Sequence, residues 1–123
     1  MGDRALVIFK DRNGEYSPVT YLHWSGYAVP TLLAEHKKLM DGRFGDLSYA
    51  TARFIGICHE HVDGNTSLGC WSLEEGDVKG LKACEETFCE GYSHGDAGVF
   101  IVDVGDMTWK QYGGYEPETV EVA

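Results

Sequence analysis

The sequence is short of positive charge and has no long hydrophobic run. Its 123 residues include 10 lysines and arginines against 20 aspartates and glutamates, which gives a formal net charge of −10. Because DNA, RNA and anionic membranes are bound by clustered basic side chains, this balance argues against any of them as a direct ligand. No apolar stretch approaches the roughly 20 residues that cross a bilayer. The apolar run 5–9 is too short for a signal peptide, and we expect a cytoplasmic protein.

Familiar catalytic and cofactor-binding motifs are also lacking. The sequence contains no Cys-x-x-Cys pair, no G-x-G-x-x-G pattern and no P-loop. Ser93, His94 and Asp96 are the residue types of a hydrolytic triad, but neighbours on one loop cannot reach one another in triad geometry. We interpret this segment as a turn. The four cysteines are expected to be buried, reduced thiols rather than disulfides. These absences favour a non-enzymatic protein without a cofactor.

The negative charge lies almost entirely in the second half of the chain. Residues 1–55 carry a formal charge of +1, whereas residues 56–123 carry −11. Such a bias should leave at least one strongly negative face in the folded protein. One interpretation is a solvated helix surface; the other is a partner-binding surface for a basic protein. The residues expected to form it are Glu74, Glu75, Asp77, Glu85, Glu86 and Glu90.

Apolar periodicity and turn residues predict one α+β domain over residues 1–123. Strands are expected near 5–10, 16–24, 66–73, 99–102 and 107–112, and helices near 30–40, 78–90 and from 47 until Asp63-Gly64 ends the helix. Local features that support these bounds are a hairpin at Asn13-Gly14, Pro30 in a first helical turn, N-caps at Asp46 and Asp77, and a type II′ turn at Gly105-Asp106. We expect a five-stranded, mostly antiparallel sheet with two to three helices packed on one face. The tail 113–123 is expected to be loosely held.

The densest set of metal-ligand types is Cys58, His59, Glu60 and His61. On a helix Cys58 and His61 share one face, whereas His59 lies on another face with Asp63. The histidines are two residues apart, so the pattern departs from the zinc-protease motif, which separates them by four. The simpler interpretation is that Cys58 and His61 line the core. The alternative function is a small metal- or thiol-dependent enzyme centred on Cys58, His59 and His61.

Three segments resemble small uncharacterised proteins of bacterial phages and prophages: Tyr21–Trp24 with Val29-Pro30, residues 52–56, and residues 96–98. The resemblance implies a bacterial cytoplasm and brings no known activity or catalytic residues. Small acidic phage proteins often inhibit host defence, and some imitate the charge of nucleic acid. By that analogy, we expect an anti-CRISPR-like inhibitor whose negative surface occupies a basic nucleic-acid-binding site of a host defence complex. Exposed aromatic residues around 112–115 would also allow two copies to pair as a homodimer.

Overall fold

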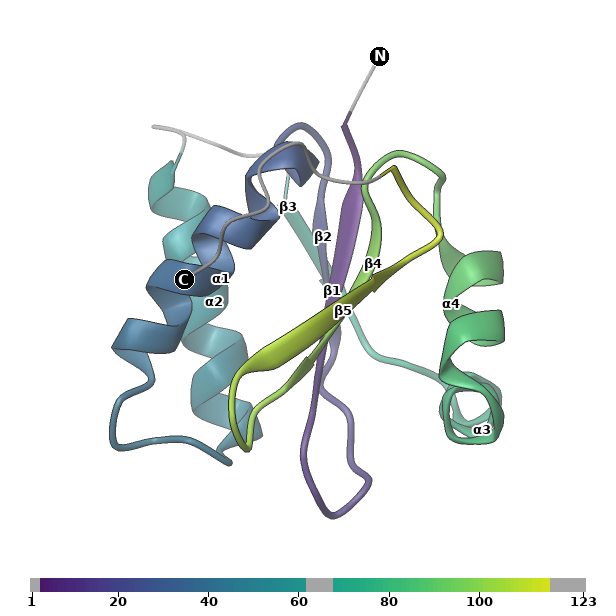
Figure 1. Ribbon diagram of the computed structural model, residues 1–123, viewed down its shortest axis with the longest axis horizontal. Coiled ribbons are helices and arrows are strands. Elements are labelled where there is room, and N and C mark those ends of the chain that lie inside the picture. Colours follow the sequence, from purple (N-terminus) through teal and green to yellow (C-terminus); the bar gives the residue numbers. More distant parts are fainter. Residues whose placement is uncertain (1–2, 62–67, 116–123) are drawn as a thin grey trace.

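The computed structural model describes residues 3–61 and 68–115, which form a five-stranded sheet between two pairs of helices (Figure 1). The strands are β1 (Ala5–Lys10), β2 (Val19–Leu22), β3 (Leu68–Trp71), β4 (Gly98–Asp103) and β5 (Thr108–Tyr112). The helices are α1 (Val29–Leu39), α2 (Leu47–His61), α3 (Glu75–Ala83) and α4 (Glu85–Tyr92), with a 3₁₀ turn at Gly26–Ala28. The α+β class and the five-stranded sheet are therefore confirmed.

The sheet has the order β3-β2-β1-β4-β5. The central strands β1 and β4 run parallel, with Leu6 beside Val99, and the other three pairings are antiparallel. The expectation of a mostly antiparallel sheet is thus confirmed. The parallel pair lies at the centre, as expected for strands that are covered on both faces.

Helices cover both faces of the sheet, so the expectation of helices on one face is wrong. The cause is β1, which is apolar on both sides. Val7 and Phe9 pack with α1 and α2, whereas Leu6 and Ile8 pack with α3 and α4, and all four side chains are fully buried. Alternate residues of a strand point to opposite faces, so each face needs its own cover.

The described residues contain four α-helices rather than two to three, because the helix expected over 78–90 is two helices. The backbone of Cys84 is extended, with φ −159° and ψ 103°, and it ends α3 and begins α4. The N-cap of α3 is Glu74 rather than Asp77. The Asp77 carboxylate instead accepts a hydrogen bond from the N–H of Glu74 at 3.0 Å, as the third residue of a capping box does.

Several local predictions are confirmed. Gly14 adopts a φ of +84° in the turn between β1 and β2, and Pro30 lies in the first turn of α1. Asp46 caps α2, since its Oδ1 accepts a hydrogen bond from the N–H of Tyr49 at 3.0 Å. The strand expected over 16–24 is shorter, covering Val19–Leu22, and it begins after Pro18, which has no N–H to donate to the neighbouring strand.

Near the C-terminus one prediction is wrong, and another differs from the structure in its described part. The turn between β4 and β5 has four residues, and Met107 rather than Gly105 holds the positive φ, at 63°. Residues 113–115, the described part of the expected loose tail, are hydrogen-bonded to the domain. The Tyr115 N–H donates to Asp96 O at 3.0 Å, and the Ser93 hydroxyl donates to Gly113 O at 2.6 Å. Residues 116–123 lie outside the described residues.

Candidate functional site

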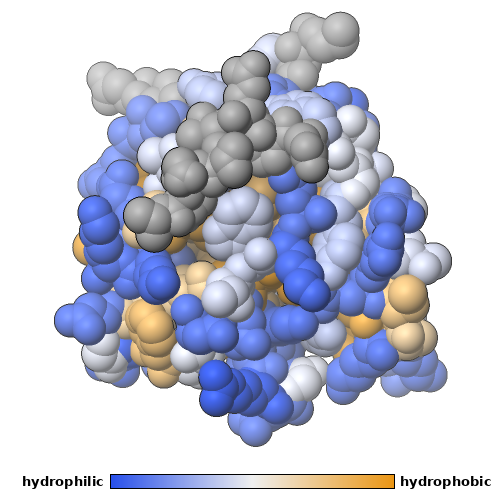
Figure 2. Space-filling model, in the orientation of Figure 1, coloured by the Kyte–Doolittle hydropathy of each residue, from blue (hydrophilic) through white to orange (hydrophobic). Residues whose placement is uncertain are grey.

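The two acidic clusters predicted from the sequence lie on α3, with its N-cap, and on α4, which cover the same face of the sheet. Glu74, Glu75, Glu86 and Glu90 are exposed, and none of them forms an ion pair with another described residue. We call these four residues the acidic surface. Hydrophilic side chains cover most of the face in Figure 2, with smaller hydrophobic areas over the α1–α2 side and the α3–α4 side.

The two other predicted carboxylates have structural partners. Asp77 is half-buried and completes the capping box of α3. Glu85 accepts hydrogen bonds from Lys10 Nζ at 2.8 Å and from the Tyr112 hydroxyl at 2.7 Å. Its side chain is only 19% exposed, so it joins α4 to β1 and β5 instead of facing a partner.

The environment of Glu85 shifts the pKa values of the groups around it. Partial burial raises the pKa of Glu85, but the hydrogen bonds from Lys10 and Tyr112 outweigh this effect and leave the pKa below its ordinary value. The same hydrogen bond raises the pKa of Lys10. Burial and the adjacent Glu85 charge raise the pKa of Tyr112. All three shifts favour a charged pair at neutral pH, with Tyr112 as a neutral donor.

The structure does not bring Cys58, His59 and His61 together. Cys58 is buried in the core, and burial raises the pKa of its thiol to about 12. His59 and His61 are exposed at the end of α2, so the expectation that His61 lines the core is wrong. No three ligand-type side chains of the described residues are close enough to hold a metal ion. Asp63 lies outside the described residues.

The cysteines are unpaired, but only two of the four are buried. Cys58 and Cys89 lie in the two cores, whereas Cys70 and Cys84 are exposed. Cys84 differs from the expectation because the helix breaks there. Its thiol lies 3.2 Å from the Thr87 hydroxyl, and this hydrogen bond, together with the backbone N–H of Thr87, lowers the pKa of Cys84.

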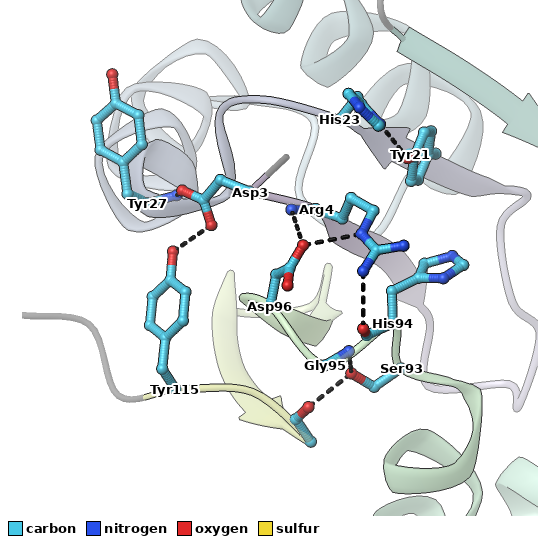
Figure 3. Close-up of polar contacts among 11 residues, drawn as sticks. Asp3, Arg4, Tyr21, His23, Tyr27, Ser93, His94, Gly95, Asp96 and Tyr115 are labelled. Atoms are coloured by element: carbon cyan, nitrogen blue, oxygen red, sulfur yellow. Dashed lines mark hydrogen bonds and ion pairs between the residues drawn. The ribbon is translucent and has the colours of Figure 1, made fainter. Parts of the chain in front are cut away.

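The segment 93–96 is a turn, as interpreted from the sequence, and Figure 3 shows its contacts. Arg4 Nε lies 2.8 Å from the carboxylate of Asp96, and Arg4 Nη2 donates to the backbone oxygen of His94 at 3.2 Å. The Gly95 N–H donates to the Ser93 hydroxyl at 2.8 Å. These bonds join the beginning of β1 to the beginning of β4. The polar groups of this turn therefore have a structural role.

A cluster of aromatic rings and histidines that sequence reasoning missed lies beside this turn. Tyr21 is at its centre, with its ring 5.9 Å from Trp71 and 5.7 Å from His94. The Tyr21 hydroxyl is hydrogen-bonded to His23 Nδ1 at 2.6 Å, and Trp71 Nε1 donates to the Tyr92 hydroxyl at 2.9 Å. We call these five residues the aromatic shelf. The sequence places Tyr21 on a strand beside His23, but only the tertiary fold brings Trp71, Tyr92 and His94 to them.

A shallow hollow of about 520 Å³ lies between the turn 11–15 and the loop 42–47. Asp11, Glu15 and Asp46 line it together with Arg43, so its charge is mixed. None of the predicted site residues lines this hollow.

No described helix has the length and apolar character that a membrane span requires. Comparison of the chain with protein-family models, with curated proteins and with solved structures yields no match.

Proposed function

We propose that this protein is a non-enzymatic binding protein that docks on a basic surface of another protein through α3 and α4. The observation that carries the proposal is the acidic surface: four exposed carboxylates on one helix pair without a described cationic partner. The target class is a nucleic-acid-binding site of a host defence complex, by analogy with small acidic phage proteins that inhibit host defence. Glu85 and Asp77 are not part of the proposed interface, because both are half-buried and bonded within the domain, whereas the other four carboxylates are exposed.

Electrostatics supports this use of α4. Glu86 and Glu90 are one helical turn apart, and like charges at this spacing cost an isolated helix a few tenths of a kcal/mol. A basic surface removes this repulsion and gains favourable pairs in its place. Long-range attraction also accelerates association at low ionic strength, and it is screened over about 10 Å at 0.1 M salt.

The test uses two double variants with the same change in net charge. Glu86→Gln with Glu90→Gln removes half of the acidic surface, whereas Glu35→Gln with Glu60→Gln removes two exposed carboxylates from α1 and α2. Proteins captured from nuclease-treated bacterial lysate are identified, and the affinity of a captured partner is measured from about 50 to 500 mM salt. We expect the first variant to weaken binding and the second to leave it unchanged. Affinity that is independent of salt, or equal effects of the two variants, would refute the proposal.

A further inference from the structure

We propose that β3 is a docking edge, to which an extended basic segment of the partner adds as a sixth strand with Trp71 as its anchor. This inference rests on the proposed function, because it names how a basic partner is held beside the acidic surface. In strand addition, backbone hydrogen bonds supply affinity, and alternate side chains supply specificity.

The two edges of the sheet differ in how they are protected. β5 carries an exposed lysine, Lys110, at its centre, and a lysine on an edge strand discourages pairing with another chain. β3 has the sequence Leu-Gly-Cys-Trp, without charge or proline. β2 is its only strand partner within the described residues, so on the side away from β2 the N–H and C=O groups of β3 have no strand partner in the part of the chain that the structure describes. β3 is therefore the edge that is open to strand addition.

Trp71 provides an anchor that is already in position. Its indole N–H is bonded to Tyr92 and its ring lies against Tyr21, yet 39% of the residue remains exposed. Gly69 pairs with Tyr21 across β2 and β3, and it has no side chain to cover the Tyr21 ring. A Cβ at Gly69 would lie 3.6 Å from Tyr21, which is ordinary contact distance. A side chain of an added strand can therefore pack beside Trp71 onto the aromatic shelf.

The charges near β3 favour a basic occupant over a second copy of this chain. Glu74 and Glu75 follow Trp71 by three and four residues and are exposed. Arg4 is already paired with Asp96 at 2.8 Å, and the exposed Lys79 of α3 forms no ion pair with Glu74 or Glu75. A second copy has a net charge of −10 and would bring further negative charge beside Glu74 and Glu75. Lysine or arginine side chains of an added strand instead pair with Glu74 and Glu75.

The experiment selects random 12-residue peptides on the immobilised wild-type protein. We expect enriched peptides to alternate apolar and polar residues and to contain lysine or arginine. Their binding should slow hydrogen exchange of the β3 amides by at least about tenfold. A Trp71→Thr variant, which keeps strand propensity but loses the anchor, should bind at least about tenfold more weakly. The control Leu39→Thr changes an exposed apolar residue on α1, which is 52% exposed against 39% for Trp71, and it should bind normally.

A peptide methylated at alternate backbone nitrogens tests the strand pairing itself, since it keeps its side chains but loses donors. Failure to enrich peptides, enrichment of acidic or helical sequences, or equal binding of the methylated peptide would each overturn the proposal. A dimer that Trp71→Thr dissociates would identify a second copy as the occupant and overturn it as well. If partner capture depends on Glu86 and Glu90 but not on Trp71, the proposed function stands and the docking edge fails. If capture instead depends on Trp71 but not on Glu86 and Glu90, the acidic surface is rejected as the interface and the docking edge stands.

Discussion

Replacing Glu85 with glutamine should destabilise the fold, whereas the same change at the neighbouring Glu86 should not. Glu85 receives hydrogen bonds from Lys10 and Tyr112, and these bonds join α4 to β1 and β5. Glu86 is exposed and forms no ion pair with a described residue. Glutamine keeps the size of the side chain but removes its charge, so the pair of variants isolates the contribution of the buried contacts.

The expected loss in the free energy of unfolding lies between two limits. Hydrogen bonds to charged groups contribute about 1.5–3 kcal/mol, whereas exposed ion pairs contribute about 0–1 kcal/mol. The side chains of Lys10 and Glu85 are 33% and 19% exposed, so water screens the pair in part. The glutamine carbonyl can still accept from Tyr112. We therefore expect Glu85→Gln to cost about 1–2 kcal/mol, or roughly 3–10 °C in melting temperature for a domain of this size.

Urea titrations of the wild type, Glu85→Gln and Glu86→Gln at several pH values provide the assay. The pKa of Glu85 is lower in the folded protein than its ordinary value of 4.5, so the unfolded chain binds the proton more readily. The stability that the pair contributes is therefore present above pH 4.5 and is lost as the pH falls below it. The difference between the wild type and Glu85→Gln should be largest near neutral pH and should shrink in acid.

Two results would contradict this reasoning. Equal urea midpoints for Glu85→Gln and Glu86→Gln at neutral pH would mean that the contacts of Glu85 contribute nothing to stability. A difference from the wild type that persists unchanged in acid would mean that the loss comes from packing and not from charge.

Three further predictions concern His36, Gly80 and Cys84. Burial lowers the pKa of His36, so the free energy of unfolding should fall as the pH drops below about 6.5, and His36→Gln should reduce this dependence in urea titrations. Gly80→Ala would place a Cβ 2.8 Å from Phe88; the overlap should outweigh the gain in helix propensity and cost about 1 kcal/mol by the same measurement. Iodoacetamide should modify Cys84 well before Cys58 in a time course followed by mass spectrometry, because Cys84 is exposed with a lowered pKa.

Local features of the fold could be predicted because they depend on neighbouring residues. Pro30 begins a helix since its fixed φ suits the first turn, and Asp46 caps the next helix through its own side chain. The break at Cys84 could not be predicted in this way. Gly80 of α3 lies close to Phe88 of α4, on the other side of the break. This packing is a tertiary contact, so the local sequence pattern does not show it.

The candidate site also has features that the sequence predicted and features that only the structure showed. Sequence alone identified the six carboxylates and the bias of charge toward residues 56–123. It could not distinguish Glu85 from Glu86, because the difference depends on Lys10 and Tyr112, which are far away in the chain. The aromatic shelf was missed for the same reason, since Tyr21 meets Trp71 and His94 only through the sheet.

The sequence by itself therefore determined the α+β class, the approximate strands and helices, and the sign of the protein's charge. These properties follow from composition, periodicity and turn chemistry, all of which act over a few residues. The tertiary structure alone decided that helices cover both faces, that β1 lies parallel to β4, and which carboxylates remain exposed. Those features depend on contacts between residues as far apart as Leu6 and Val99, and local patterns do not encode such pairings.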